Sequence, residues 1–414
     1  MRTMVRNMMQ DTIWVTVLQG LNYLIPLFVW PYLIVVLGAE GFGVVGFAMA
    51  FVQFLMLVVD FGFNLTATKQ IATATSQEAI NVLSSATLWA KALLFVLAVI
   101  IGAVVLCLPQ FATYRIAVVV LLPMLFSSVF SMQWLYQGTG NIRRLWIMNS
   151  ACRLVIIPLT FVIVKSAANV LPAVGIQSAA YFVSAIVGLV WALKHGLFVF
   201  RRTTWQAVRE SLKDSFPLFV STATSSVYAM LLVVVLGYFA STQEVGLYSA
   251  VEKMMRVACY ALLLPALQVC YPQISKLAAT DRKSALRMVR VLCGGLAVLM
   301  GIIGCVLFFG GEQLMALMGK DYGGSAQLFR IMAFIPVLVT ISGVYGQLDL
   351  LAIGGERQKW QFRNVYLLGA SVAVVLVVCF IPGLTAVITA HILCITEAVV
   401  ASGMLLFAIL RHRE

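Results

Sequence analysis

Four basic residues interrupt long apolar runs of this sequence: Lys91, Arg153, Lys253 and Arg256. A charged side chain at the centre of a membrane span costs about 2.5–3.5 kcal/mol on insertion scales, so such residues usually face protein or water and carry function. On one run, Ser249, Lys253, Arg256 and Tyr260 follow at intervals of four, three and four residues, which places them on a single helix stripe. This pattern predicts a cationic surface that lines a cavity.

Acidic and span-end residues form a secondary set of candidates. Glu252 lies four residues before Arg256 and can pair with it, which leaves Lys253 unmatched within that helix. Asp60, with Asn64 on the next turn, favours a structural ion pair over a proton-carrying role. The remaining secondary candidates lie near span ends: Arg115, Arg330 and Asp349. Contact with lipid headgroups explains the two arginines as well as function does, and it is also open to Arg153.

The sequence contains no pattern for covalent chemistry. It lacks a phosphate-binding Gly-Lys-Ser/Thr loop, a His/Cys cluster with metal-ligand spacing and a nucleophile motif. We therefore expect a protein that is not an enzyme and that holds no metal or cofactor. Coupling to a gradient of H⁺ or Na⁺ stays open.

Long apolar helices must position these charged residues. Of 414 residues, 62% are hydrophobic and 10% are charged, against about 25% charged in soluble domains. Continuous apolar runs rather than alternating ones predict an all-α bundle in a membrane. Turn residues divide the runs into about twelve spans, with these approximate limits: 12–37, 42–66, 80–107, 115–137, 146–165, 171–194, 216–239, 245–273, 285–309, 325–350, 361–381 and 384–409.

The distribution of basic residues predicts the orientation of these spans. Lys and Arg gather in alternate connections, notably 194–213, 276–290 and 357–363. The positive-inside rule places these connections, and with them both termini, in the cytoplasm. The orientation of the spans in the membrane thus explains the net charge of +13, and nucleic acid is not an expected partner.

The chain also divides near its midpoint. We expect a six-helix lobe over 1–200, a cytoplasmic linker over 201–215 and a second six-helix lobe over 216–414. A short sequence match aligns Gly43, after the first span, with Gly246, after the seventh. An even number of spans in each half implies a parallel repeat about an axis along the membrane normal.

Four segments carry a resemblance to a known family: GAEGFG (38–43), DFGFNLTATK (60–69), GLYSAVEK (246–253) and YPQIS (271–275). With these segments, the chain resembles the Wzx-type O-antigen and polysaccharide repeat-unit flippases of the multidrug/oligosaccharidyl-lipid/polysaccharide exporter superfamily. The resemblance covers essentially the whole chain in length, span count and two halves.

The resemblance implies a fold, a substrate and a location. Two six-helix lobes would enclose a cavity whose basic lining fits Lys91, Arg153, Lys253 and Arg256. The substrate would be an oligosaccharide on undecaprenyl pyrophosphate, moved across the bacterial inner membrane by alternating access. Membrane lipid, a glycan polymerase and a chain-length regulator are the further partners implied. Neutral substitution of Lys91 or Lys253 is then expected to abolish translocation and leave the protein in the membrane.

Three other functions compete with this one. A multidrug or organic-cation antiporter of the same superfamily needs acids in its cavity, whereas bases outnumber acids within these spans. A membrane-embedded glycan polymerase or ligase needs a large outer loop, and the longest one here, around 310–324, is short. A scaffold in a glycan-assembly complex would tolerate loss of the charged residues.

Overall fold

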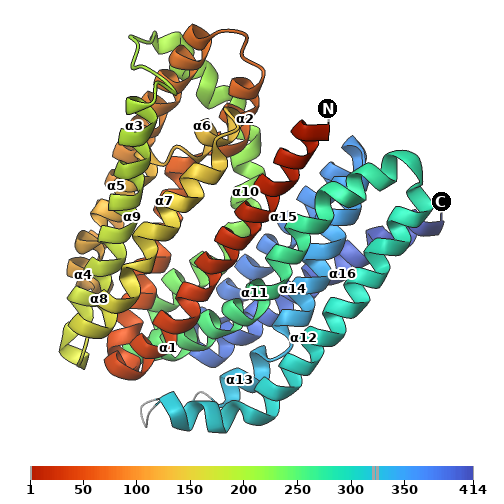
Figure 1. Cartoon of the computed structure of the whole chain (residues 1–414). Helices are drawn as coiled ribbons and strands as arrows, with labels where there is room; N and C mark the ends of the chain where they lie inside the picture. The colour runs from red at the N-terminus through yellow and green to blue at the C-terminus, as the bar shows by residue number, and fades with distance from the viewer. Residues whose placement is uncertain (1, 319–321, 323–325, 414) are drawn as a thin grey trace. The chain divides into compact units, whose positions relative to one another are not determined.

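The computed structural model describes the backbone of residues 2–318, 322 and 326–413. It also describes their side chains, except at 2–27, 217, 221–222, 224–229, 261, 268, 272, 279, 312, 314–318, 356, 359, 412 and 413. Every regular element in these ranges is a helix (Figure 1). The all-helical class predicted from the sequence is therefore confirmed for the described part of the chain.

The helices run in chain order as follows: α1 (Arg2–Asp60), α2 (Phe63–Ala72), α3 (Gln77–Cys107), α4 (Arg115–Val120), α5 (Leu122–Phe130), α6 (Gln133–Gly138), α7 (Ile142–Leu154), α8 (Ile156–Ile163), α9 (Val170–Lys194), α10 (Trp205–Phe239), α11 (Thr242–Thr280), α12 (Arg282–Met318), α13 (Ala326–Met332), α14 (Ile335–Gly343), α15 (Glu356–Phe380) and α16 (Ala386–Arg413). A π-helix, η4 (Val344–Ile353), continues α14, and three short 3₁₀ turns are η1 (Pro109–Tyr114), η2 (Ala167–Asn169) and η5 (Ile381–Gly383).

The chain forms two compact units, and each takes residues from both halves of the sequence. Unit 1 consists of Met1–Ile25 and Phe47–Ser226, and unit 2 of Pro26–Gly46 and Val227–Glu414. The expected lobes 1–200 and 216–414 therefore differ from the observed units. The divisions fall inside α1 and inside α10, and the expected linker 201–215 belongs to unit 1.

Close backbone packing explains why residues 26–46 belong to unit 2. A Cβ on Gly246 of α11 would lie 1.7 Å from the carbonyl oxygen of Ala39, and one on Gly43 would lie 2.0 Å from that of Thr242. The Tyr322 hydroxyl donates a hydrogen bond of 3.1 Å to the carbonyl oxygen of Ile34. The two glycines that the sequence aligned as repeat equivalents thus also pack against each other.

Nine helical stretches among the described residues are long and apolar enough to cross a membrane. A tenth arises if Pro109–Val120 and Leu122–Gly138, which meet at an angle of 51°, form one bent span. The first two expected spans both lie within α1, which Gly38 divides into two helices because its backbone (φ 67°, ψ 177°) is not helical, a conformation open mainly to glycine. A membrane bundle is supported, and the number twelve stays a prediction.

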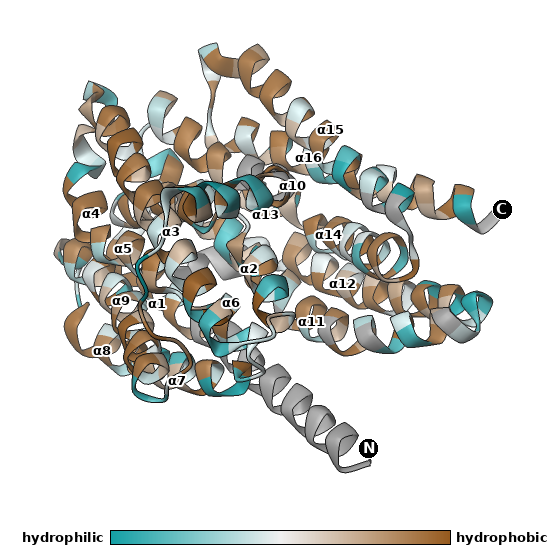
Figure 2. Ribbon diagram, turned by 90° about the horizontal axis from the view of Figure 1, so that it is seen from above, coloured by the Kyte–Doolittle hydropathy of each residue, from teal (hydrophilic) through white to brown (hydrophobic). Residues whose placement is uncertain are grey.

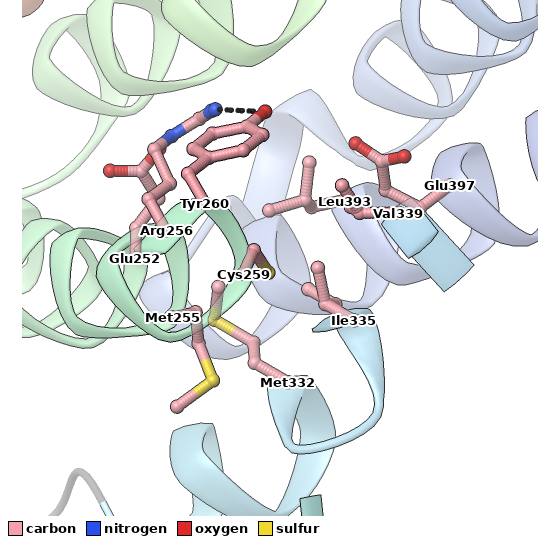
Figure 3. A pocket seen from close by; sticks show the side chains of 10 residues that line it. All are labelled: Glu252, Met255, Arg256, Cys259, Tyr260, Met332, Ile335, Val339, Leu393 and Glu397. Carbon is pink, nitrogen blue, oxygen red and sulfur yellow. Dashed lines mark hydrogen bonds and ion pairs between the residues drawn. The ribbon is translucent and has the colours of Figure 1, made fainter. Parts of the chain in front are cut away.

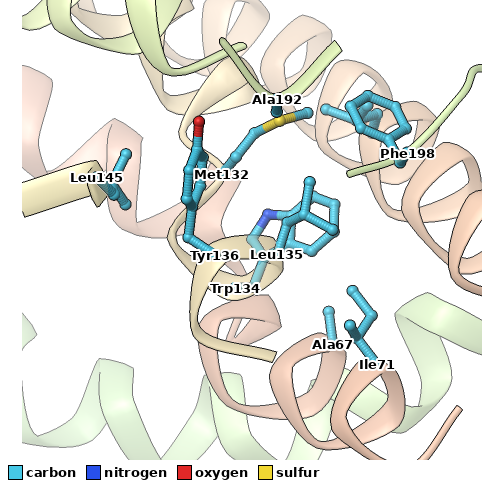
Figure 4. Packing of buried hydrophobic residues seen from close by; sticks show 10 residues of the cluster. Ala67, Ile71, Met132, Trp134, Leu135, Tyr136, Leu145, Ala192 and Phe198 are labelled. Carbon is cyan, nitrogen blue, oxygen red and sulfur yellow. The ribbon is translucent and has the colours of Figure 1, made fainter. Parts of the chain in front are cut away.

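Large apolar side chains point outward from these helices. Trp89, Val104 and Phe309 are 62%, 65% and 77% exposed, and brown, the colour of hydrophobic residues, predominates along the ribbon in Figure 2. Water would disfavour such a surface, whereas hydrocarbon suits it. Hydrophobic clusters also form inside the units, and one in unit 1 packs Trp134, Leu135 and Tyr136 of α6 against Ile71 and Phe198 (Figure 4).

Candidate functional site

The ion pair expected of Asp60 is present in unit 1, and its partner is Lys91. The Lys91 ammonium lies 2.9 Å from Asp60 Oδ1 and donates further to the carbonyl oxygens of Ser128, at 2.9 Å, and Ser131, at 3.4 Å. These three acceptors match the three N–H donors of a lysine. Lys91 is fully buried, so in this structure it offers no free hydrogen-bond donor to a ligand.

A strained turn positions Asp60 at the end of α1. Phe61 (φ 42°) and Gly62 (φ 80°) both have left-handed backbones, which is uncommon for a bulky residue such as phenylalanine. Gly62 also lies against α10, because a Cβ there would be 2.9 Å from the backbone nitrogen of Phe219. The Thr66 and Ser215 hydroxyls hydrogen-bond at 2.6 Å on the same interface. The DFGFN motif therefore builds the helix junction that presents Asp60.

A polar cavity of about 170 Å³ opens beside Asp60 within unit 1. Its lining includes hydroxyl, amide and aromatic side chains: Ser127, Ser128, Ser131, Gln133, Asn149, Ser184, Trp146 and Tyr181. Asn149 Oδ1 accepts a 2.5 Å hydrogen bond from Ser184, which ties α7 to α9. The buried α6 cluster supports this cavity, since its residues Met132 and Leu145 also line it. Such a lining suits sugar hydroxyls and rings.

Arg153 supplies the surplus charge of this cavity. Its guanidinium carbon lies 4.7 Å from the ring centroid of Tyr181, a cation–π contact that leaves the N–H edge available. Its Nε is buried with no hydrogen-bond partner among the described residues. Because Lys91 balances Asp60, the cavity wall keeps one net positive charge. An anionic ligand would satisfy it.

The predicted polar stripe of α11 lies in unit 2 and contains the expected pair of Glu252 and Arg256. Arg256 Nε donates to Glu252, and its terminal nitrogen lies 3.4 Å from the Tyr260 hydroxyl (Figure 3). Lys253 is not unmatched, contrary to expectation. Its ammonium lies 3.9 Å from the Glu252 carboxylate and 5.7 Å from the Trp30 ring centroid. One buried carboxylate thus faces two cations.

Glu397 of α16 lies across a small pocket from this stripe (Figure 3). The pocket holds about 20 Å³, room for a single water molecule, and Arg256, Tyr260 and Glu252 also line it. The two acids and two bases of this region are therefore balanced in number. The sequence placed Glu397 within a span but did not indicate that it would line the same pocket as Arg256.

The other secondary candidates have structural surroundings. Arg115 donates to the last carbonyl oxygens of α3 and its cap, at Leu106 and Leu108 among others, and so caps that helix. Asp349, in η4, accepts a 2.5 Å ion-pair hydrogen bond from Arg411 of α16. Arg330 is exposed in the last turn of α13. Asn64 is partly buried, and its Oδ1 has no hydrogen-bond partner among the described residues.

Sequence reasoning missed three polar side chains near Arg153 in this cavity. Asn149 lies on α7, whereas Tyr181 and Ser184 lie on α9, and α8 and η2 come between these two helices in the chain. The available signal was their spacing, since Trp146, Asn149 and Arg153 follow at three and four residues and share one helix face with Arg153 as its only charge. From the sequence alone, this polar face was not distinguished from the apolar face of the same span.

Known proteins resemble this chain over nearly its whole length. A protein of Escherichia coli (strain K12) named as an O-antigen transporter is 30% identical over 410 residues, 98% of each chain. Among solved structures, an inward-facing multidrug-resistance MATE transporter of the MOP superfamily superposes with a TM-score of 0.71 at 15% identity, over 95% of this chain and 94% of that one. The lipid II flippase MurJ in an inward closed conformation gives 0.69 at 15% identity, over 96% and 86%.

The two solved structures establish a shared transporter fold. The family is established by sequence, because a profile of the family described as "Polysaccharide biosynthesis protein" matches residues 8–278. This match and the 30% identity to the Escherichia coli protein confirm the resemblance to Wzx-type transporters. The chain therefore belongs to the polysaccharide biosynthesis protein family, as a membrane transporter and not an enzyme.

Proposed function

We propose that this chain moves undecaprenyl-pyrophosphate-linked oligosaccharide repeat units from the cytoplasmic to the periplasmic leaflet by alternating access. The full-length similarity to an O-antigen transporter supports the substrate class. The single structural observation that carries the proposal is Arg153. It is a cation with a free N–H edge in a cavity lined by hydroxyl, amide and aromatic groups. A pyrophosphate joined to a sugar needs both kinds of partner.

The proposed direction of transport depends on orientation. The basic connections 194–213, 276–290 and 357–363 support cytoplasmic termini in a bacterial inner membrane. Arg153 then lies on the cytoplasmic half of its span, where substrate is loaded. We further propose that lobe movement uses a gradient of H⁺ or Na⁺, and that the product passes to a glycan polymerase and a chain-length regulator.

An organic-cation antiporter is the second candidate function. Glu252 and Glu397 beside one small pocket are groups that such a protein would need. Drug-susceptibility testing of a deletion strain separates the two functions. A flippase mutant keeps its susceptibility to cationic drugs while it loses surface glycan, and an antiporter mutant does the reverse.

Complementation of a flippase-deletion strain tests the role of Arg153. A hydrogen bond to a charged group contributes about 1.5–3 kcal/mol, so Arg153→Gln should weaken substrate binding by roughly 10- to 100-fold. Surface glycan, measured at matched membrane expression, should fall, and lipid-linked intermediate should accumulate. Arg153→Lys keeps the charge but not the forked geometry and should give an intermediate loss. Lys253→Met should also reduce surface glycan.

Arg201 provides a matched control for the loss of one arginine. It forms an exposed pair with Glu78, in which both side chains are more than half exposed, and such surface pairs contribute little. Arg201→Gln should therefore restore glycan as well as the wild type does. Full glycan with Arg153→Gln at wild-type expression would remove the observation on which the proposal depends.

A further inference from the structure

A broad apolar groove lies beside the Arg153 cavity on the same pair of helices in unit 1. It encloses about 650 Å³ between α7–α8 and α9. Its walls are aliphatic, with Val155, Ile156, Leu159 and Ile163 on one side and Ile176 and Val183 on the other. Ala151 and Ala179 at its mouth are exposed, so the groove opens outward rather than into the core.

The groove and the polar cavity occupy adjacent faces of the same helices. On α7, Asn149 and Arg153 line the cavity, whereas Ala151 and Cys152 line the groove. On α9, Tyr181 and Ser184 line the cavity, whereas Ala180 and Val183 line the groove. A ligand with a charged head and an apolar chain would thus find both partners within one turn of helix.

A helix break separates the two parts of this site. Pro158 lacks an N–H, so the carbonyl oxygen of Leu154 loses its helical partner, and the helix ends there before α8 begins at Ile156. The polar residues precede the break, and most of the groove follows it. From 151 to 163 the groove wall extends about 18 Å along the helix axis. That length is roughly three fifths of a hydrocarbon core of about 30 Å.

We propose that this groove holds the isoprenoid tail of the lipid-linked glycan while Arg153 binds its pyrophosphate. The inference rests on the proposed function and adds a place for the tail. With cytoplasmic termini, the Arg153 end of the site lies nearer the cytoplasmic leaflet, and the groove extends from there past the bilayer centre toward the outer ends of the expected spans 146–165 and 171–194. This is the orientation of a lipid in that leaflet, with its head at the cytoplasmic surface and its chain inward.

Photolabelling of the full-length purified protein in nanodiscs tests the tail site. The probe is a polyprenyl pyrophosphate without sugar that carries a photoreactive group on its chain. We expect labelled peptides from 151–183, and we expect unlabelled undecaprenyl pyrophosphate to compete. Phosphatidylglycerol at the same excess should compete at least tenfold less well. Equal competition by phosphatidylglycerol would mean that the groove holds ordinary membrane lipid, which overturns the inference.

Two groove-filling variants and one control refine the test. Ala151→Trp and Ala179→Trp place an indole in the mouth of the groove from opposite walls, and both positions are exposed, so folding should tolerate them. Val190→Trp adds the same bulk on an exposed position of α9 outside the groove. Labelling of 151–183 should fall several-fold in the first two variants and stay at the wild-type level in the control.

Surface glycan distinguishes failure of this inference from failure of the proposed function. Variants that lose labelling but restore full glycan would show that the groove is not needed, while the flippase function stands. A wild-type chain that restores no glycan would defeat the proposed function whatever the labelling. Loss of both labelling and glycan in the two groove variants, at matched expression, is the expected result.

Discussion

At the scale of single residues, the burial of Lys91 changes what its substitution should do. Removing one partner of a buried ion pair costs about 3–5 kcal/mol, whereas replacing both by neutral groups can be nearly neutral. Lys91→Met and Asp60→Asn should each lower the amount of folded protein, because each leaves the other charge uncompensated. The double variant should recover much of the loss. Thermal unfolding in detergent and membrane accumulation provide the measurements.

The sequence alone predicted a different result for neutral substitution of Lys91. It predicted loss of translocation while the protein stays in the membrane. A Lys91→Met variant that accumulates and unfolds like the wild type, yet gives no surface glycan, would instead indicate that Lys91 acts at the substrate site.

The sequence indicated that Asp60 would pair, but not with which base. Lys91 is 31 positions away, and Ser128 and Ser131 of a third segment complete its shell. Such a partner set is fixed by tertiary packing rather than by spacing along one helix.

At the scale of helices, the contact of α1 with α11 depends on two glycines. Gly246→Ala would place a methyl group 1.7 Å from the Ala39 carbonyl oxygen, and backbone atoms on both sides cannot rotate away. Overpacking of this kind costs about 1–3 kcal/mol, so the unfolding temperature should fall. Gly294→Ala on α12 is the control, since nothing lies within 4 Å of its added Cβ. That variant should gain about 0.5–1 kcal/mol of stability.

An unfolding temperature of Gly246→Ala at or above that of Gly294→Ala would contradict this contact.

The same helices show what the sequence could predict of the fold. Apolar length and turn residues predicted the helical class, and a local match aligned Gly43 with Gly246. The break between the first two spans was also predicted from its turn residues, and Gly38 there has a non-helical backbone (φ 67°, ψ 177°).

At the scale of the whole molecule, the two units exchange segments of sequence. Residues 26–46, from the start of the chain, belong to unit 2, and residues 205–226, from α10, belong to unit 1. Composition and loop charge placed a boundary in the connection 201–215, where Lys and Arg gather. Composition and loop charge indicate where the chain crosses the membrane and which connections are cytoplasmic. Membership of a compact unit depends on which faces pack, and in unit 2 the Gly43 and Gly246 backbones are in contact.

The exchange predicts that neither half folds without the other. A chain cut between Arg202 and Thr203 gives fragments 1–202 and 203–414. Alone, the second lacks Ile34, which accepts the Tyr322 hydrogen bond, and the first lacks Ser215, the partner of Thr66. Each fragment should therefore be degraded when expressed singly, and the pair should accumulate and restore surface glycan.

Membrane immunoblots of each fragment, alone and together, provide the measurement. Gly246→Leu in the second fragment serves as the control, because it obstructs the site that residues 39–43 must occupy. That variant should block rescue by 1–202, whereas Gly294→Ala should not. Fragment 203–414 that accumulates and resists protease without its partner would show that unit 2 is complete without residues 26–46. The lobe boundary at 201–215 would then describe the folding units better than the exchange does.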